Sequence, residues 1–317
     1  MTATGSVLRH ATHRLDRQAM ALLLLCLTLG MVARAQQPET AATLAFLEGP
    51  TVDRDGNVYF VEMTTPRIMK LGADGVLTTY REKSNNANGL VIDAEGRLIA
   101  CEGAESNRNG VKVPANARVT RTDLRTGAME VLASSYEGMP LRGPNDVTVD
   151  RRGRIYFTDL AGSAVFRIDT NGRLTRILSN AEVQRPNGIQ ISPDDSKLYV
   201  ADSFPPPADT RRIHVFDLSD DGSAHDGRVL YDFGTVRGAD GMSIDVEGNL
   251  YAAAGSGATK NTGIHVISPQ GKLVKVMPIP EDPITNNAFG GADMKTLYVT
   301  AGKTLYRLRT DIAGLPR

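Results

Sequence analysis

The chain has 317 residues, which is enough for one large all-β domain or for two ordinary domains. Its 36 Lys and Arg balance 36 Asp and Glu, and no basic stripe or block of like charge occurs, which argues against a nucleic-acid partner. Of the 2 cysteines only Cys101 lies beyond the N-terminal apolar run, so no internal disulfide can hold the domain together.

Residues 1–35 have the pattern of a secretory signal peptide. Several arginines precede an apolar run over 19–33, and Ala33-Arg34-Ala35 forms an A-x-A cleavage site. The run is shorter than the roughly 20 residues that a membrane-spanning helix needs. We therefore expect an exported protein, periplasmic or secreted, with no membrane anchor after cleavage. Its mature part would be a single domain over 36–317, with 32 basic against 35 acidic residues.

One hairpin pattern recurs along the mature chain, and residues 142–159 show it most clearly. Pro144-Asn145-Asp146 opens a short apolar strand, a tight turn follows at 150–153, and a second strand closes the hairpin. Equivalent second strands are expected at 57–62, 97–102, 154–159, 197–202, 249–254 and 296–301. Self-similarity of this kind is typical of repeat folds.

Each hairpin except the last is followed by two more short strands. These pairs are expected at 67–80, 118–132, 164–178, 213–233 and 263–277. Only one strand, 303–309, follows the sixth hairpin. Because four antiparallel strands make one propeller blade, we predict an all-β, six-bladed β-propeller. Residues 36–47 are expected to supply the missing outer strand and so close the ring, which removes exposed sheet edges.

Side chains that carry oxygen recur where each first strand begins. Counting back eleven residues from the equivalent Tyr or Ile of each second strand, or twelve in the fourth hairpin, reaches Glu48, Asn88, Asn145, Asn187, Asp240 and Asn287. Asn-Gly and Asp-Gly are ordinary turn sequences, but turn chemistry alone would admit Ser, Gly or Pro at several of these positions. Since the inner strands of a propeller line a central channel, the six side chains are expected to converge there.

A ring of carboxylate and amide oxygens is a hard donor set. It suits one divalent metal cation in the central channel, with Ca²⁺ favoured and Mg²⁺, Mn²⁺ or Zn²⁺ as alternatives. The charges of Glu48 and Asp240 also require a cation if water is excluded. Other chemistry has less support, because the sequence has no G-x-S-x-G, H-E-x-x-H, P-loop or G-x-G-x-x-G motif. A Ser-His-Asp triad stays open, although no motif points to one.

The loops that follow the second strands are expected to border this site. The longest and most irregular of them are 103–117, 203–211 and 255–262. Arg142 lies on the same rim, where it either contacts an anionic or carbonyl oxygen of a substrate or is simply solvated. Asp159 and Asp202 end second strands on this face and are expected to act on the site only through other residues.

Six segments carry a resemblance to a known family. They read EGPTVDRDGNVYF, ANGLVIDAEGRLIACE, PNDVTVDRRGRIYFTD, RPNGIQISPDDSKLYVADS, ADGMSIDVEGNLY and TNNAFGGADMKTLYVTA. From Glu48 to about Arg307 the chain resembles the senescence marker protein (regucalcin), gluconolactonase and luciferin-regenerating enzyme family. The resemblance implies a six-bladed propeller with a divalent metal in its channel, and members that include lactonases.

The resemblance also implies a role for each matching residue. Asp240 would be both a metal ligand and the catalytic base. The metal ligands would be Glu48, Asn145, Asn187 and Asp240. The contacts to substrate, or to water held by the ion, would come from Asn145, Arg142, Asn88 and Asn287. The chain departs from many relatives at Val52, where they have Trp, and at Gly103, where many bacterial relatives have His, so the shape of the pocket is left open.

The leading interpretation is a metal-dependent lactonase that opens a sugar-type, gluconolactone-like lactone. The metal would polarise the carbonyl, and Asp240 would assist the attack of water. Two alternatives stay open: a non-catalytic periplasmic propeller that binds a ligand, and a phosphotriesterase or other ester hydrolase that uses the same metal. The expected partner is a small-molecule lactone or ester, and the protein is expected to be a monomer or a weak oligomer.

Overall fold

The computed structural model describes residues 37–103, 106–108, 111–113, 116–203, 211–234, 237–255 and 262–316, with the backbone alone at 106–108 and 111–113. By its contacts the chain divides into two units, 1–37 and 38–317, and every element described below belongs to the second. The expected signal peptide, residues 1–35, lies outside the described residues. Within them, no helix is long and apolar enough to span a membrane.

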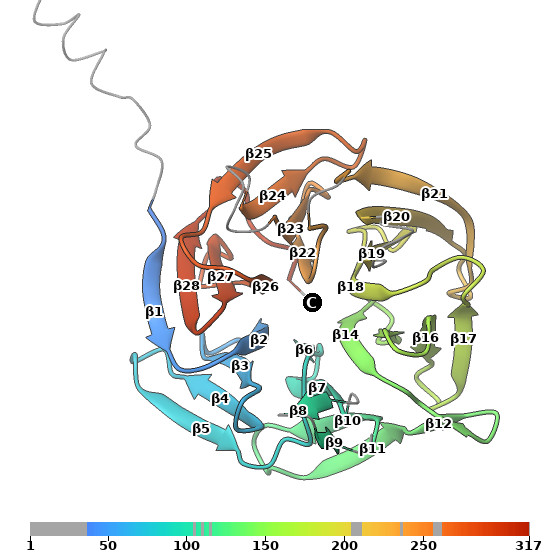
Figure 1. Ribbon diagram of the computed structural model, residues 1–317, viewed down its shortest axis with the longest axis horizontal. Helices are drawn as coiled ribbons and strands as arrows, with labels where there is room; N and C mark the ends of the chain where they lie inside the picture. The colour runs from blue at the N-terminus through green and yellow to red at the C-terminus, as the bar shows by residue number, and fades with distance from the viewer. Residues whose placement is uncertain are drawn as a thin grey trace, which may run out of the picture. The chain divides into compact units, whose positions relative to one another are not determined.

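Six four-stranded antiparallel sheets surround a central channel, as the sequence predicts (Figure 1). Blade 1 consists of β2 (Leu47–Val52), β3 (Val58–Glu62), β4 (Arg67–Leu71) and β5 (Leu77–Arg81). Blade 2 consists of β6 (Leu90–Ile92), β7 (Arg97–Glu102), β10 (Arg118–Asp123) and β11 (Met129–Ala133). Blade 3 consists of β14 (Pro144–Val149), β15 (Ile155–Asp159), β16 (Ala164–Ile168) and β17 (Leu174–Leu178).

The second half of the chain repeats this arrangement, and the first strand of each blade is innermost (Figure 1). Blade 4 consists of β18 (Pro186–Ile191), β19 (Lys197–Ser203), β20 (Arg211–Leu218) and β21 (Ala224–Asp232). Blade 5 consists of β22 (Met242–Ile244), β23 (Leu250–Ala254), β24 (Gly263–Ile267) and β25 (Leu273–Pro278). Blade 6 consists of β26 (Ile284–Gly290), β27 (Thr296–Ala301), β28 (Thr304–Arg309) and β1 (Glu39–Thr43). Two short hairpins, β8 (Ser106–Arg108) with β9 (Val111–Val113) and β12 (Ser135–Tyr136) with β13 (Met139–Pro140), are additional.

The ring is closed by the N-terminal strand, which confirms the prediction made from the incomplete sixth repeat. β1 is the outermost strand of blade 6 and pairs antiparallel with β28, with Glu39 opposite Arg307. These two side chains also form an ion pair, with 3.0 Å between Glu39 Oε2 and Arg307 Nε. The first and last parts of the domain therefore share one sheet, and the edge of β28 is covered.

An aspartate that opens the tight turn sets the register of the inner hairpin in blades 1, 2, 3 and 5, and blade 3 illustrates it. Asp150 Oδ1 accepts hydrogen bonds from the backbone N–H groups of Arg152 and Arg154, at 3.0 and 2.9 Å. Its Oδ2 accepts from Arg154 Nε at 2.5 Å and from the Tyr156 hydroxyl at 3.2 Å. Gly153 has a φ of +81°, which other residues resist. The same two backbone hydrogen bonds occur in blades 1, 2 and 5. There the Oδ1 atom of Asp53, Asp93 or Asp245 accepts from the backbone N–H groups of the second and fourth residues that follow it.

The core lies between neighbouring blades, where large side chains of one blade pack on the next. Tyr156 of blade 3 is fully buried in a cluster with Ile189, Ile191 and Leu198 of blade 4. Tyr251 of blade 5 is buried in the same way against blade 6. Removing one such ring costs about 3–5 kcal/mol in other proteins, so these contacts hold adjacent blades at fixed positions around the channel.

Candidate active site

The strand register defines one equivalent position at the start of each innermost strand. The residues opposite Tyr59, Ile99, Tyr156, Tyr199, Tyr251 and Tyr298 are Thr51, Val91, Thr148, Gln190, Ser243 and Ala288. Three places before each of these are Glu48, Asn88, Asn145, Asn187, Asp240 and Thr285, which we call the ring residues. The sequence count reached the first five of them.

In blade 6 the sequence count is wrong by two residues. The turn between β26 and β27 is longer than its equivalents, so the register places Asn287 opposite Val299 and moves the ring position back to Thr285. Thr285 is 1% exposed, and its hydroxyl donates to the carbonyl oxygen of Leu47 at 2.8 Å. Asn287 lies deeper in the channel, where its Nδ2 donates to the carbonyl oxygen of Tyr251 and its Oδ1 accepts from Ser243.

Hydrogen bonds between neighbouring blades fix the backbone of the ring residues. The backbone N–H of Gly89 donates to the carbonyl oxygen of Asn145 at 2.7 Å, and that of Gly188 donates to Asp240 at 2.9 Å. A Cβ atom on Gly188 would collide with the same Asp240 oxygen, so this close approach requires glycine. The Asn-Gly sequence that resembles ordinary turn chemistry thus serves contact between blades.

Two carboxylates of the ring, from blades 1 and 5, have pKa values raised above the usual range. Glu48 is 7% exposed, and burial raises its pKa well above the usual range, with the charges of Asp240 and Asp146 adding to the shift. Burial also raises the pKa of Asp240, although Arg237 and Asn187 oppose this shift by hydrogen bonding to it. Buried carboxylates that repel one another mark a functional site.

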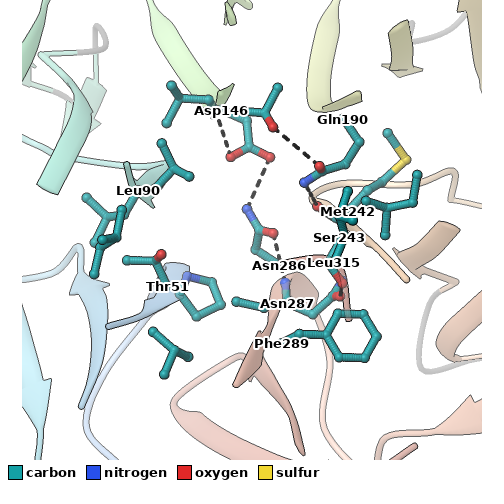
Figure 2. A pocket seen from close by; sticks show the side chains of 18 of the residues that line it. Thr51, Leu90, Asp146, Gln190, Met242, Ser243, Asn286, Asn287, Phe289 and Leu315 are labelled. Carbon is teal, nitrogen blue, oxygen red and sulfur yellow. Dashed lines mark hydrogen bonds between the residues drawn. The ribbon is translucent and has the colours of Figure 1, made fainter. Parts of the chain in front are cut away.

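Asp146 is a third acid at this site, and the sequence analysis did not single it out. It follows Asn145 directly, is 6% exposed, and has a pKa raised to about 7, chiefly by burial. Its Oδ2 accepts a hydrogen bond from Asn286 Nδ2 at 3.3 Å (Figure 2). A signal was present in the sequence, because the residue after the ring position is glycine in blades 1, 2, 4 and 5 but Asp146 in blade 3.

The two acids that end second strands, Asp159 and Asp202, anchor the backbone ahead of the ring. Asp159 accepts hydrogen bonds from the backbone N–H groups of Arg142 and Gly143, at 2.9 and 2.6 Å. Asp202 does the same for Gln184 and Arg185, at 3.0 and 2.7 Å. They therefore position the segments that lead to Asn145 and Asn187. The Arg142 side chain is exposed at the rim, as expected from the sequence.

Two of the predicted positions contribute half-buried amide groups. Asn88 and Asn145 open the innermost segments of blades 2 and 3, and both are partly exposed. The backbone N–H of Asn88 donates to the carbonyl oxygen of Cys101 at 2.9 Å, which holds the start of blade 2 in place. The loops expected to border the site, 103–117, 203–211 and 255–262, fall largely outside the described residues.

The donor set fits a hard divalent cation. No group of three or more His, Cys, Asp and Glu that could hold a metal occurs among the residues whose positions are described, so carboxylates alone do not make the site. Glu48 and Asp240 must be joined by amide oxygens, as from Asn145 and Asn187, and such all-oxygen sets suit Ca²⁺ or Mg²⁺. The acids Glu48, Asp146 and Asp240 also outnumber the guanidiniums of Arg237 and Arg185 that act on this site, and a cation would offset the excess of negative charge.

Below the ring, the channel contains a polar cavity of about 120 Å³ (Figure 2). Asp146, Gln190, Ser243, Asn286 and Asn287 supply polar groups to its wall, and Leu315 and Phe289 supply apolar ones. The C-terminal segment runs along its far end, where the backbone N–H of Leu315 donates to the carbonyl oxygen of Ile244 at 3.0 Å. A polar cavity of this size has room for ordered water.

A Ser-His-Asp chain, which the sequence left open, occurs on the outer edge of blade 4. Ser219 Oγ lies 3.1 Å from His225 Nε2, and His225 Nδ1 lies 2.9 Å from Asp226 Oδ2. The Asp226 side chain is 81% exposed, and that of His225 is 47% exposed. Water screens such a chain, whereas a catalytic triad relies on a buried acid to orient its histidine. The arrangement is a surface hydrogen-bond chain.

Comparisons with known proteins agree with the propeller fold. The chain is 28% identical to a gluconolactonase of Zymomonas mobilis, over 86% of this chain and 81% of that protein. It is 25% identical to the pentonolactonase XacC of Haloferax volcanii, over 80% of each chain. The solved structure of a gluconolactonase of Xanthomonas campestris superposes with a TM-score of 0.73 at 26% identity, covering 86% of this chain and 89% of that one. Residues 46–303 match the family described as the SMP-30/Gluconolactonase/LRE-like region. The chain therefore belongs to the SMP-30, gluconolactonase and luciferin-regenerating enzyme-like family.

Proposed function

We propose that the protein is a lactone hydrolase whose active site is the ring at the mouth of the channel. The observation that carries this proposal is the meeting of Glu48 and Asp240, from blades 1 and 5, in one buried, amide-lined ring. Membership of the family and the similarity to proteins named gluconolactonase and pentonolactonase support a lactone as the substrate. A sugar-type lactone, such as gluconolactone, is the first substrate to test.

The site would hold one divalent cation, with Ca²⁺ favoured and Mg²⁺, Mn²⁺ or Zn²⁺ to be compared. Glu48, Asn145, Asn187 and Asp240 would hold it through oxygen. A cation bound there would polarise the lactone carbonyl and stabilise the negative charge that develops on its oxygen. The burial of Glu48 suits a purely structural ligand, because water and substrate have little access to its carboxylate.

Asp240 is the better placed of the two ring carboxylates for proton transfer. Its side chain is 18% exposed, so a water molecule can reach it. Asp240 takes a proton from that water as the water oxygen bonds to the carbonyl carbon. The ring C–O bond of the lactone then breaks, and the proton returns from Asp240 to the departing alkoxide oxygen. One lactone and one water thus give one hydroxy acid, and the enzyme is unchanged.

Three residues at the rim would orient the substrate. Asn88 and Asn145 present half-buried amide groups within the ring, and the exposed guanidinium of Arg142 can donate to a carbonyl or carboxylate oxygen. Holding the carbonyl carbon next to the attacking water removes much of the entropic part of the barrier. The anchoring of the Arg142 backbone by Asp159 keeps this segment in place.

A lactone panel tests the proposal. Purified residues 36–317 are mixed with sugar lactones of five- and six-membered rings, with each of the four cations in turn, and acid release is followed by a pH indicator. Aryl esters and phosphotriesters belong in the same panel, because they distinguish a lactonase from another ester hydrolase. Release of acid from no lactone, together with a chelator-sensitive melting temperature, would point instead to a non-catalytic propeller that binds a cation.

Export is a separate proposal that rests on residues 1–35. Cell fractionation with an antibody to the mature domain, and N-terminal sequencing of the exported form, test it directly. Cleavage after Ala35 is expected. We also propose a monomer or weak oligomer, which sedimentation of the mature protein would test.

A further inference from the structure

A second layer of residues lies directly beneath the ring. It consists of the residues that follow the ring positions: Gly49, Gly89, Asp146, Gly188, Gly241 and Asn286. Only two of the six have a side chain, and both side chains are polar. They come from β14 and β26, which lie on opposite sides of the channel (Figure 1).

These two side chains meet across the channel. Asn286 Nδ2 donates to Asp146 Oδ2 at 3.3 Å, although the residues are 140 positions apart in the chain (Figure 2). Each is oriented by the next backbone N–H, because Asp146 Oδ1 accepts from Val147 at 3.1 Å and Asn286 Oδ1 accepts from Asn287 at 2.8 Å. Both residues are 6% exposed, so the bond is shielded from water.

The glycines of this layer make the space that the pair occupies. A Cβ atom on Gly241 would fall on the Asn286 amide, and one on Gly89 would collide both with the Asp146 carboxylate and with the backbone of Asn145 and Asp146. Neither glycine has a positive φ, so the backbone does not require glycine there. The requirement is steric: at Gly241 it follows from the Asn286 side chain, and at Gly89 it follows from the Asp146 side chain together with the adjacent backbone.

Threonine hydroxyls connect this layer to the ring above it. Thr158 Oγ1 accepts from the backbone N–H of Asp146 at 3.0 Å and donates to the carbonyl oxygen of Asn187 at 2.8 Å. On the opposite blade, Thr300 Oγ1 accepts from the backbone N–H of Asn286 at 3.2 Å. The bridging pair and the ring residues therefore share hydrogen-bond partners, and a shift in one is passed to the other.

We propose that the Asp146–Asn286 bridge is the floor of the cation site, where it fixes the ring oxygens in place and adds a carboxylate charge beneath the cation. This inference rests on the proposed function, since it needs a cation in the ring. Asp146 and Asn286 are positioning residues: they act through Asn145, Asn187 and the cation, and they do not contact substrate. The two parts of the effect, charge and bridge, can be removed separately.

Direct measurement of cation binding tests the floor. Calcium chloride is titrated into the chelator-treated mature protein by calorimetry, and manganese chloride serves as a second probe. Asp146→Asn removes the charge but keeps an oxygen that can accept from Asn286, and Asn286→Ala removes the bridge but keeps the charge. Each is expected to weaken binding about 10- to 100-fold, as residues that support metal ligands do elsewhere.

Two further variants sharpen the result. Thr148→Val is the matched control, because Thr148 lines the same cavity and bonds to Gln190 at 3.4 Å without taking part in the floor. It is expected to bind Ca²⁺ with the wild-type dissociation constant. The exchange variant, Asp146→Asn with Asn286→Asp, restores one carboxylate and one amide in reversed order. It is expected to bind more tightly than Asp146→Asn alone.

The melting temperature in chelator separates this inference from a purely structural role. If Asp146→Asn and Asn286→Ala lower the melting temperature but bind Ca²⁺ and Mn²⁺ as the wild type does, the pair only stabilises the fold and the inference is wrong. If the wild-type protein binds neither cation, the proposed cation site fails, and the inference fails with it. Weaker binding that the exchange variant partly restores supports the floor.

Discussion

Arg237 donates a hydrogen bond to Asp240 three residues further along the chain, with 2.5 Å between Nη2 and Oδ2. The same guanidinium lies 3.8 Å from Asp282 Oδ1. It stands beside the residue proposed as the base and opposes the rise in its pKa that burial causes. Arg237 therefore favours the ionised form of Asp240, the form that can accept a proton.

Arg237→Met is expected to move the acidic limb of the pH–rate profile to higher pH. Loss of the guanidinium removes the largest of the groups that oppose the effect of burial, so the pKa of Asp240 rises further and less of it is ionised at low pH. Below the limb, kcat/KM falls by up to about tenfold for each pH unit that the limb moves. The measurement is kcat/KM for lactone hydrolysis between pH 4 and pH 9.

Arg212→Met is the matched control for this change. Arg212 pairs with Asp232 at 2.8 Å near the start of β20 and is not among the main groups that shift the pKa of Asp240. Loss of Arg212 should leave the acidic limb of the pH–rate profile at its wild-type pH. A profile for Arg237→Met that coincides with the wild type would contradict the assignment of Asp240 as the base.

In chelator, stability is expected to fall as pH rises from about 4 to about 7. The pKa of Asp146 is raised from 3.8 to about 7 by burial, so the folded state binds a proton that the unfolded state has already released in this range. The stability that the protonated form provides is complete below pH 4 and is lost by pH 7. The size of the effect is on the order of a few kcal/mol.

Urea unfolding of Asp146→Asn tests this sign. The free energy of unfolding of the wild type minus that of the variant should decrease as pH rises from 4 to 7. Above pH 7 this difference should stay constant. Asp194→Asn provides a contrast, because hydrogen bonds from Ser192 and Ser196 lower the pKa of Asp194 to about 2. Its effect is confined to the acid end, below about pH 4. A wild-type advantage over Asp146→Asn that grows with pH would contradict the account.

Asp150→Ala is expected to destabilise the fold by about 3–5 kcal/mol. It removes one partner of a buried ion pair and leaves the Arg154 guanidinium, 10% exposed, without its carboxylate. It also removes the acceptor that holds the turn of blade 3. Urea unfolding measures the loss. Asp150→Asn keeps an acceptor for the backbone and should lose less, whereas equal losses would show that charge alone matters.

Deletion of residues 36–44 is expected to lower the melting temperature and promote self-association. It removes β1, exposes the edge of β28, and breaks the Glu39–Arg307 pair. Removal of 1–35 alone serves as the control and should change neither property. Light scattering and thermal unfolding of both truncated proteins provide the comparison. A deletion variant that stays monomeric with an unchanged melting temperature would show that closure by β1 contributes nothing.

The fold could be predicted from the sequence because its signals are local and repeated. A tight turn with Asp first and Gly last recurs in the inner hairpins of blades 1, 2, 3 and 5, and the missing strand of the sixth repeat indicated where residues 36–47 must pair. The ring in blades 1 to 5 followed from the same count. The count failed in blade 6, where it reached Asn287, because the turn between β26 and β27 has two additional residues. The sequence of residues 290–295 does not show that the turn is longer.

The floor of the site could not be predicted in this way. Asn-Asp and Asn-Asn fit ordinary turns, and although Asp146 stands where four other blades have glycine, this difference does not indicate which side chain it meets. The pairing of Asp146 with Asn286 becomes visible only when blades 3 and 6 face each other across the channel. The same holds for Arg237, because proximity in sequence to Asp240 does not reveal that the two side chains bond. Contacts across a closed ring depend on its geometry, which no single repeat encodes.

Asp240→Asn tests the central claim most directly, if metal content and lactone hydrolysis are measured on the same sample. Asparagine keeps an oxygen for the cation but cannot take a proton from water. Elemental analysis should show the cation retained, while kcat for gluconolactone falls by about 10²–10⁴-fold, the usual contribution of a general base. A variant that keeps both its cation and the wild-type rate would contradict the proposal that Asp240 is the base in this ring.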